Sequence, residues 1–303
     1  LLRGLGPDSP VSELKRLKGG SPTETPVTAG TGTRRSALLR LMRRHSINQV
    51  PLVDENLRVV SLVTRKELTF TEELPVRAVV MGGGFGSRLG SLTENLPKPM
   101  LPVGDRPLLE LIVGQLRKAG ITQIVVTTHY KGEVIRDYFG NGADFGVEMD
   151  YIEEEEPLGT AGSLALLPVG DALVLVINGD VLTQVDYRAV VDFHREHHAD
   201  VTIGLRQHEL TVPYGVVDTD GVTVRGISEK PVIRNFISAG VYLLDPTVCS
   251  KVPRGRASDM PDLITKVIED GGSVIGFPVR EYWLDIGHLA NYKAAQAAVG
   301  RDS

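Results

Sequence analysis

A glycine-rich segment followed by two cations is the strongest chemical signal in the sequence. Residues 82–90 read GGGFGSRLG, with five glycines in nine positions, and Arg88 lies within them. Lys98 follows between two prolines. Glycine lets main-chain N–H groups approach a ligand closely, and polyphosphate is the usual ligand of such a loop. The segment therefore predicts a phosphate-binding loop.

Two common phosphate motifs do not account for this loop. A Walker A motif needs Gly-Lys-Ser/Thr, which the chain does not contain. The dinucleotide fingerprint G-x-G-x-x-G fails because Ser87 or Leu89 occupies its last position. The loop must belong to another class of nucleotide site or be a turn without a ligand.

The elements that must position this loop alternate between strand and helix. Strand-like apolar runs at 76–81, 123–128 and 172–178 alternate with helical patterns at 107–120, 131–140 and 187–199. This predicts an α/β fold, a mostly parallel sheet flanked by helices. Ligands of such sheets bind at the carboxyl ends of strands. The glycine loop and the NGD at 178–180 are both expected there.

Composition and charge divide the 303 residues into two parts. Residues 1–75 hold 12 Lys and Arg against 8 Asp and Glu, while the whole chain carries a net charge of -5. We expect a small N-terminal α+β region, 1–75, and a larger domain, 76–303. The acidic balance gives no general attraction to nucleic acid or membranes. The single Cys249 and the absence of a long apolar run favour a cytoplasmic protein.

Several segments in a fixed order resemble the sugar-1-phosphate nucleotidyltransferases, which have a Rossmann-like fold. They are GGGFGSRLGSLTENLPKPMLPV from 82, PLGTAGSL from 157, NGD from 178, SEKP from 228 and WLDIG from 283. The segments YGVV from 214 and NFISAGVYLL from 235 are similar to the family's sugar-pocket segments. The resemblance covers residues 76–300. It implies that an NTP and a sugar 1-phosphate give an NDP-sugar and pyrophosphate, with Mg²⁺ as cofactor.

The resemblance also assigns roles to residues. The catalytic set would be Arg88, Lys98, Asp180 and Lys230, and Asp180 and Asp285 would hold Mg²⁺. The nucleotide would contact Gly83, Gly84, Gly86, Ser87, Arg88, Lys98, Gly159, Thr160 and Gly162. The sugar phosphate would contact Gly215, Glu229, Lys230, Ser238 and Gly240. These residue types suit the chemistry, because Mg²⁺ usually takes one or two carboxylates and completes its shell with water and phosphate.

Two other clusters look chemical but favour simpler interpretations. The acidic run Glu153 to Glu156 is expected to be a solvated face, with Glu156 the candidate for a place beside the nucleotide. His194, His197 and His198 share one expected helix. No Cys or distant third ligand accompanies them, so we expect a solvated helix end and not a zinc site.

The N-terminal region resembles part of a CBS (cystathionine-β-synthase-type) domain. The resemblance rests on VPLVDENLRVVSLVTRKEL, from Val50 onward. Its ribose-contacting T-x-x-D pattern stands as Thr64-Arg65-Lys66-Glu67, with Glu for Asp. We therefore expect packing or homo-oligomer formation through this region, and not nucleotide sensing.

The base and the sugar stay open at this stage. The pairing with a CBS-like region favours GTP and a mannose-, heptose- or glucosamine-type phosphate for cell-surface glycan synthesis. CTP, UTP or dTTP, or a non-sugar phosphate, is the alternative within the same chemistry. A nucleotide-sugar sensor without turnover, coupled to the CBS-like region that would transmit its signal, is the alternative from another class. Such a sensor has no need of both Asp180 and Asp285.

Overall fold

The computed structural model describes residues 26–33, 35–65, 73–84, 86–168 and 170–299. The chain divides into two compact units, Leu1–Thr71 and Glu72–Ser303. The domain boundary at 75/76 that the sequence suggests stays a prediction. No helix in the described ranges is long and apolar enough to cross a bilayer.

The N-terminal unit contains a helix and a small sheet. Helix α2 (Arg35–Arg44) precedes β2 (Gln49–Val53) and β3 (Val59–Thr64), which pair antiparallel, and β1 (Ala29–Gly30) pairs parallel with β2. Leu38, Met42 and Val50 form its core. Lys66 and Glu67, half of the expected ribose-contacting pattern, lie outside the described residues.

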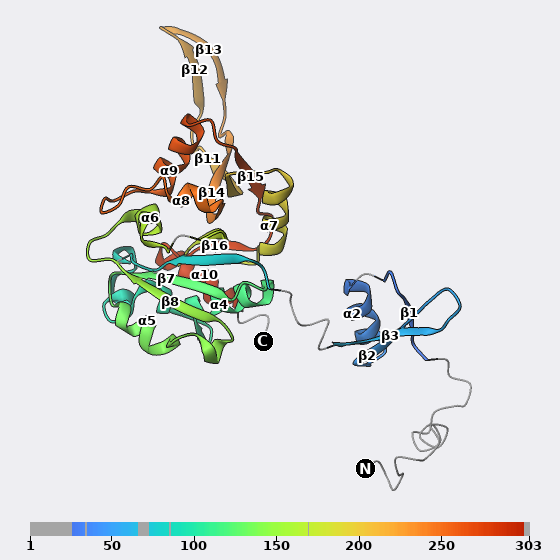
Figure 1. Cartoon of the computed structure of the whole chain (residues 1–303). Coiled ribbons are helices and arrows are strands. Elements are labelled where there is room, and N and C mark those ends of the chain that lie inside the picture. The colour runs from blue at the N-terminus through green and yellow to red at the C-terminus, as the bar shows by residue number, and fades with distance from the viewer. Residues whose placement is uncertain (1–25, 34, 66–72, 85, 169, 300–303) are drawn as a thin grey trace. The chain divides into compact units, whose positions relative to one another are not determined.

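A seven-stranded sheet organises the second unit (Figure 1). Its strand order is β15-β11-β14-β9-β4-β7-β8. The strands are β4 (Val76–Met81), β7 (Gln123–Thr128), β8 (Glu148–Glu153), β9 (Leu173–Asn178), β11 (Val201–Thr211), β14 (Val232–Leu244) and β15 (Val274–Pro278). Only β14 runs antiparallel to its neighbours, β9 and β11. The expected α/β fold with a mostly parallel sheet is confirmed.

Both faces of this sheet are covered, and the strand sequences show why. Successive side chains of a strand point to opposite faces. In β4, Ala78 and Val80 enter one apolar cluster with α4 (Leu108–Ala119), while Val79 enters a second cluster with α9 (Met260–Glu269). A strand buried on both faces must be apolar throughout, which explains the continuous run VRAVVM.

Shorter elements complete the unit. The remaining helices are α5 (Gly132–Phe139), α6 (Gly159–Gly162), α7 (Tyr187–Glu196), α8 (Pro246–Cys249) and α10 (Leu289–Val299). The 3₁₀ helices are η1 (Ser87–Thr93), η2 (Lys98–Met100), η3 (Ala143–Phe145) and η4 (Ser163–Leu166). Three antiparallel strand pairs of the described unit lie outside the main sheet. Two of them are β5 (Pro102–Val103) with β6 (Arg106–Pro107), and β10 (Val181–Thr183) with β16 (Trp283–Asp285). The third lies at the end of a long ribbon.

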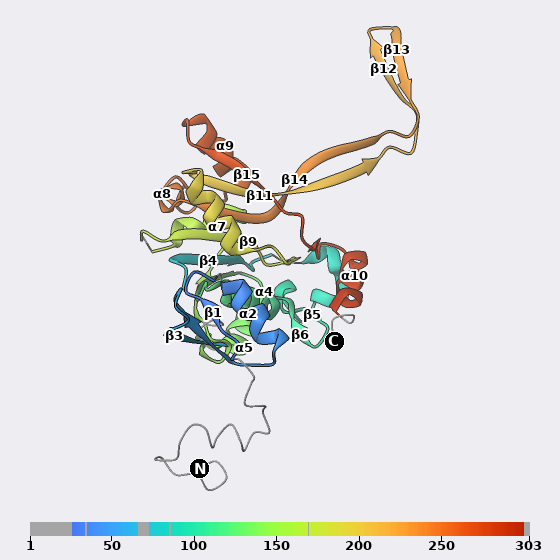
Figure 2. The same cartoon turned by 90° about the vertical axis from the view of Figure 1, so that its right-hand side faces the viewer.

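A long two-stranded ribbon extends from the sheet, as Figure 2 shows. Strands β11 and β14 continue to pair beyond the sheet, from Leu205 with Ser238 to Thr211 with Val232. The hairpin of β12 (Val216–Asp220) and β13 (Thr223–Ser228) follows at its end. We call residues 205–238 the arm.

Candidate active site

The glycine loop, the NGD segment and the start of α6 surround one cavity. Its volume is about 400 Å³, and 18 residues line it. They are Met81, Gly82, Gly83, Gly84, Gly86, Arg88, Leu89, Lys98, Pro99, Thr127, Glu154, Pro157, Gly159, Thr160, Asn178, Gly179, Asp180 and Gly287. The cavity opens at the carboxyl ends of β4, β7 and β9, where the α/β topology places ligands.

The backbone of the glycine loop is held in one conformation. Gly86 has φ 65°, in the left-handed region, and a Cβ there would lie 2.8 Å from Thr93 Cγ2. The buried hydroxyl of Thr93 donates to the carbonyls of Gly86 and Gly90, at 3.0 and 3.1 Å. Only glycine fits at residue 86, and Thr93 closes the loop around it.

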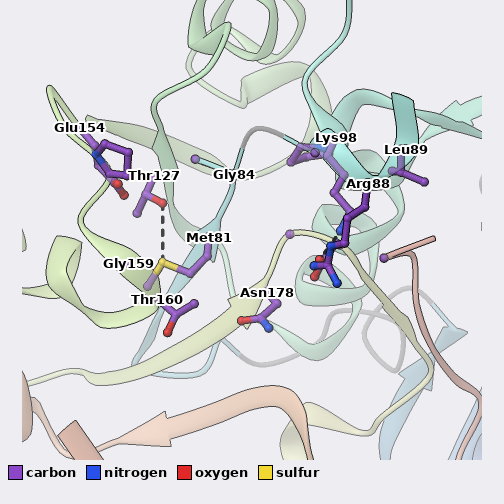
Figure 3. A pocket seen from close by; sticks show the side chains of 18 residues that line it. Met81, Gly84, Arg88, Leu89, Lys98, Thr127, Glu154, Gly159, Thr160 and Asn178 are labelled. Atoms are coloured by element: carbon purple, nitrogen blue, oxygen red, sulfur yellow. Dashed lines mark hydrogen bonds and ion pairs between the residues drawn. The ribbon is translucent and has the colours of Figure 1, made fainter. Parts of the chain in front are cut away.

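The two cations lie together on one side of the cavity (Figure 3). Lys98 begins η2 directly after Pro97, is only 8% exposed and forms an ion pair with Asp180 Oδ2. Arg88 is exposed and lines the same cavity. A buried ammonium is costly unless it is paired, so Asp180 and Lys98 stabilise each other.

The two aspartates expected to hold a metal come together through β10 and β16. Val181 is in register with Asp285, and Ile286 N–H donates to the Asp180 carbonyl at 2.8 Å. Burial, and next the negative charge of Asp180, raise the pKa of Asp285, whereas Lys98 and Arg88 oppose the shift. Asp285 Oδ1 is buried without a hydrogen-bond partner.

This pair fits a hard cation. Two neighbouring carboxylates, one with an unpartnered buried oxygen, repel each other until a cation lies between them. Within the described residues, no group of three or more His, Cys, Asp or Glu side chains could hold a metal. Two carboxylates suit Mg²⁺, which takes the rest of its shell from water and substrate phosphate.

The opposite side of the cavity is built from neutral groups and one buried carboxylate. Figure 3 shows Met81, Thr127, Glu154 and Thr160 away from the two cations. Glu154 is 6% exposed, and its Oε2 accepts from Leu158 N–H at 3.0 Å. The prediction of a solvated acidic run is therefore wrong for Glu154. Strand β8 ends at Glu153, so the chain turns there and carries the next side chain inward.

The other predicted nucleotide contacts differ in their positions. Thr160 lines the cavity, but its hydroxyl donates to Asp259 Oδ1 and accepts from Met260 N–H. Gly162 is buried against Ser258, to whose carbonyl it donates at 3.1 Å, and does not line the cavity. Ser87 begins η1, and its side chain is outside the described part of the structure.

The predicted sugar-phosphate contacts are not gathered at the cavity. Gly215, Glu229 and Lys230 lie on the arm, and none lines the cavity. Ser238 donates to Tyr242 Oη at 2.7 Å and accepts from Gly240 N–H at 3.2 Å. Gly240 has φ 69°, and a Cβ there would lie 2.8 Å from Asn178 Nδ2, so it supports a residue of the cavity wall.

Sequence reasoning gave Asn178 no role of its own, although it recognised NGD. Asn178 ends β9, lines the cavity and has a buried Oδ1 without a hydrogen-bond partner. A buried unpartnered amide oxygen is rare and is ready for a ligand donor. Its position at the carboxyl end of a central strand is the signal that could have identified it.

Of the three histidines expected at a solvated helix end, His194 is buried. His194 is 3% exposed, and its Nδ1 lies 2.8 Å from Thr202 Oγ1. Burial lowers the pKa of His194. The prediction fails for this residue because α7 turns its face toward β11.

The geometry agrees with comparisons to known proteins. Residues 77–301 match the family model described as nucleotidyl transferase, and residues 7–71 match the CBS domain model. The chain therefore belongs to the sugar-1-phosphate nucleotidyltransferase family and carries a CBS domain on its N-terminal side.

Relatives within the family differ in the substrates their names give. The chain is 35% identical over 234 residues to mannose-1-phosphate guanylyltransferase of Mycobacterium tuberculosis, covering 75% of this chain and 65% of the relative. It is 34% identical over 226 residues to D-glycero-alpha-D-manno-heptose 1-phosphate guanylyltransferase of Aneurinibacillus thermoaerophilus, covering 73% and 97%. The chain thus spans less than two thirds of the mannose relative's length.

A solved structure shows the same fold. The crystal structure of HddC from Yersinia pseudotuberculosis complexed with GMP-PN matches with a TM-score of 0.57 and 25% identity. The match covers 74% of this chain and 99% of that chain.

Proposed function

We propose that the Glu72–Ser303 unit transfers a nucleotidyl group from an NTP to a sugar 1-phosphate, giving an NDP-sugar and pyrophosphate. The observation that carries the proposal is the convergence of Arg88, Lys98, Asp180 and the glycine loop on one cavity, beside Asp285. A phosphoryl-transfer site needs this combination of positioned cations, backbone donors and carboxylates.

The reaction needs no covalent enzyme intermediate. An oxygen of the sugar phosphate attacks the α-phosphorus in line, and a new P–O bond forms there. The bond between the α-phosphorus and the bridging oxygen breaks, and its electron pair leaves with pyrophosphate. The attacking oxygen is already anionic, so no general base is required. Positioning and charge neutralisation account for the catalysis.

Each charged residue then has a role. Arg88, whose planar fork suits phosphate oxygens, binds the departing β- and γ-phosphates. Lys98 places its charge near the α-phosphate, and Asp180 and Asp285 are the residues that would hold Mg²⁺. The metal, when bound, supplies positive charge against the phosphates. Lys98 exchanges its ion pair with Asp180 for a phosphate contact when substrate arrives.

Two features support GTP as the nucleotide. Two of the relatives named above are guanylyltransferases. The buried Glu154 lies across the cavity from the cations, where the base would lie if the phosphates meet Arg88 and Lys98. A carboxylate only accepts hydrogen bonds, and guanine alone among the four bases presents two adjacent donors, N1–H and N2–H₂. A mannose- or heptose-type 1-phosphate is the proposed partner substrate.

The test is a matrix of four NTPs against mannose, heptose, glucosamine and glucose 1-phosphates, read by pyrophosphate release with Mg²⁺. The full chain should turn over GTP with a mannose- or heptose-type phosphate. Preference for UTP would align it with a relative from Synechocystis named UTP–glucose-1-phosphate uridylyltransferase, 31% identical over 249 residues. Binding without turnover in every pair would favour a sensor.

A further inference from the structure

We propose that two copies of this chain exchange their arms, so that the Glu229 and Lys230 of each copy complete the cavity of the other. The inference rests on the proposed function, because it assigns these residues to the second phosphorylated substrate.

The arm stands apart from the rest of its own unit. Figure 2 shows β12 and β13 far from the seven-stranded sheet, joined to it by the paired ends of β11 and β14. No residue from Gln207 to Phe236 is buried. A two-stranded ribbon by itself is marginally stable in water. The arm therefore needs a surface to pack on.

Its composition is that of an interface. Leu210 pairs across the strands with Ile233, and Val217 with Ile227, and all four are exposed. Phe236 is 68% exposed. The other exposed large apolar side chains of the arm are Tyr214, Val216, Val222, Val224 and Val232. Together these ten side chains expose on the order of 1,000 Å² over the two faces of the ribbon, whereas a stable interface buries ~800 Å² per partner.

The cavity lacks the charge that a second phosphate requires. Its lining includes the cations Arg88 and Lys98 and the carboxylates Glu154 and Asp180, and no further Lys or Arg of the described chain lines it. Lys98 is already paired with Asp180. The triphosphate would use both cations, so a sugar phosphate needs another from elsewhere.

The base of the hairpin presents such a cation in a fixed conformation. Lys230 has φ 46°, unusual for a residue other than glycine, and its N–H donates to the Tyr214 carbonyl at 3.2 Å. A residue other than glycine held in this region is strained, and such strain clusters at functional sites. Glu229 lies against Gly215, with its Oε2 3.1 Å from where a Cβ would stand. The base of the hairpin thus holds three residues in a defined arrangement, Gly215, Glu229 and Lys230.

Exchange between two copies brings Glu229 and Lys230 of one copy to the cavity of the other without breaking the hydrogen bonds of the arm. The ladder from Leu205 with Ser238 continues through Val212 N–H to the Pro231 carbonyl, so the arm is hydrogen-bonded along its length. Folding it back onto its own cavity would bend or break that ladder. A twofold pair leaves the ladder intact and buries both arms, as exchange of an identical element does at low cost.

Subunit complementation tests the exchange directly. Asp180→Asn removes a cavity residue and Lys230→Ala removes an arm residue. The two full-length variants, carrying different tags, are co-expressed and the heterodimer is purified through both tags. With the sugar 1-phosphate held well below its wild-type KM, each homodimer should show at most about a tenth of the wild-type turnover. The heterodimer should show about half the wild-type turnover per dimer, because one of its sites combines an intact cavity with an intact arm. Background turnover in the heterodimer, with an active wild type, would overturn the exchange.

Sedimentation analysis tests the interface without using activity. The double variant Ile227→Ser, Phe236→Ser should shift the full chain from dimer to monomer. Ile268→Ser, which removes a similarly exposed apolar side chain on α9, is the matched control and should remain dimeric. Circular dichroism checks that each variant is folded. A monomeric wild type contradicts the proposal, and so does a double variant that stays dimeric and keeps the wild-type KM for the sugar phosphate. If the wild type is dimeric but inactive and the double variant is monomeric, the interface stands and the proposed catalytic function is refuted.

Discussion

Two lysines of the proposed active site lie in opposite surroundings. Lys98 is 8% exposed, fixed beside two prolines and paired with Asp180. Lys230 is exposed, on a ribbon in which no residue from Gln207 to Phe236 is buried by the other described elements of its own unit. Packing and an ion pair fix the position of the Lys98 side chain in the cavity wall, whereas the left-handed backbone conformation at Lys230 fixes the direction in which its side chain leaves the arm. In our proposal the nucleotide half of the site is complete within one chain, and the sugar half depends on where the arm packs.

The largest expected effect comes from the cavity wall. Asp180→Asn should keep the fold and lower kcat by about 10³, because a neutral amide is a weaker metal ligand and leaves the charge of Lys98 unpaired. Steady-state pyrophosphate release with a circular dichroism spectrum measures this. A kcat within a few-fold of wild type would remove Asp180 from the metal site.

Substitutions of the two lysines should change different kinetic constants. Lys98→Met should lower kcat with either substrate saturating, since its charge acts at the α-phosphate. Lys230→Ala should raise KM for the sugar phosphate by about 10–100-fold and leave KM for the NTP nearly unchanged, the scale of one charge-assisted contact. Matching kinetic changes in both variants would show that the two regions are not separate halves.

A substitution of Glu154 tests whether this residue selects the base of the nucleotide. Glu154→Gln should lower kcat/KM for GTP by about 10–100-fold relative to UTP, because the amide replaces an acceptor with a donor facing guanine N–H groups. Ratios of kcat/KM for the two nucleotides measure this change. An unchanged ratio would place the base elsewhere. Glu153→Gln, at an exposed neighbour, is the matched control.

Alanine substitutions at two glycines with similar backbone conformation can distinguish the cost of backbone strain from the effect of crowding a neighbouring side chain. Gly240 (φ 69°) faces Asn178 Nδ2 at 2.8 Å from an added Cβ, whereas Gly221 (φ 59°), in the β12–β13 turn, has nothing within 4 Å. Both Ala variants should lose about 1 kcal/mol from left-handed strain. Gly240→Ala should also displace Asn178 and reduce turnover several-fold. Chemical denaturation and kinetics measure the two effects, and equal turnover in both variants would exclude a role for Asn178.

The smallest effect concerns stability without metal. The pKa of Asp285 is raised in the folded protein, so the folded state binds this proton more tightly than the unfolded state does. The stabilising contribution of this proton is fully present below the ordinary carboxyl pKa and is lost as pH rises through the raised value. Asp285→Asn should therefore raise Tm at pH 7 in chelator by roughly 2 °C and abolish the stabilisation by Mg²⁺. A lowered Tm would mean that burial and the charge of Asp180 do not disfavour the Asp285 carboxylate in the metal-free protein.

Sequence patterns foretold the features that depend on neighbours along the chain. Apolar runs and helical periodicity predicted the α/β sheet, because burial on both faces requires continuous apolar strands. The glycine loop and the Pro-Lys-Pro segment carry their conformational preferences locally. These segments therefore identified the family and the phosphate side of the cavity.

Contacts between distant segments decided the rest. Glu154 is one of four consecutive glutamates, and only the end of β8 turns it inward. His194 is the same residue type as the exposed His197 and His198 just beyond the end of α7, and only its contact with Thr202 of β11 distinguishes it from them. The pairing of β10 with β16 brought Asp285 to Asp180 across a hundred residues, and no local pattern encodes such a pairing. The arm shows the same division, since its residues are recognisable in sequence but their distance from the cavity is a property of the tertiary fold.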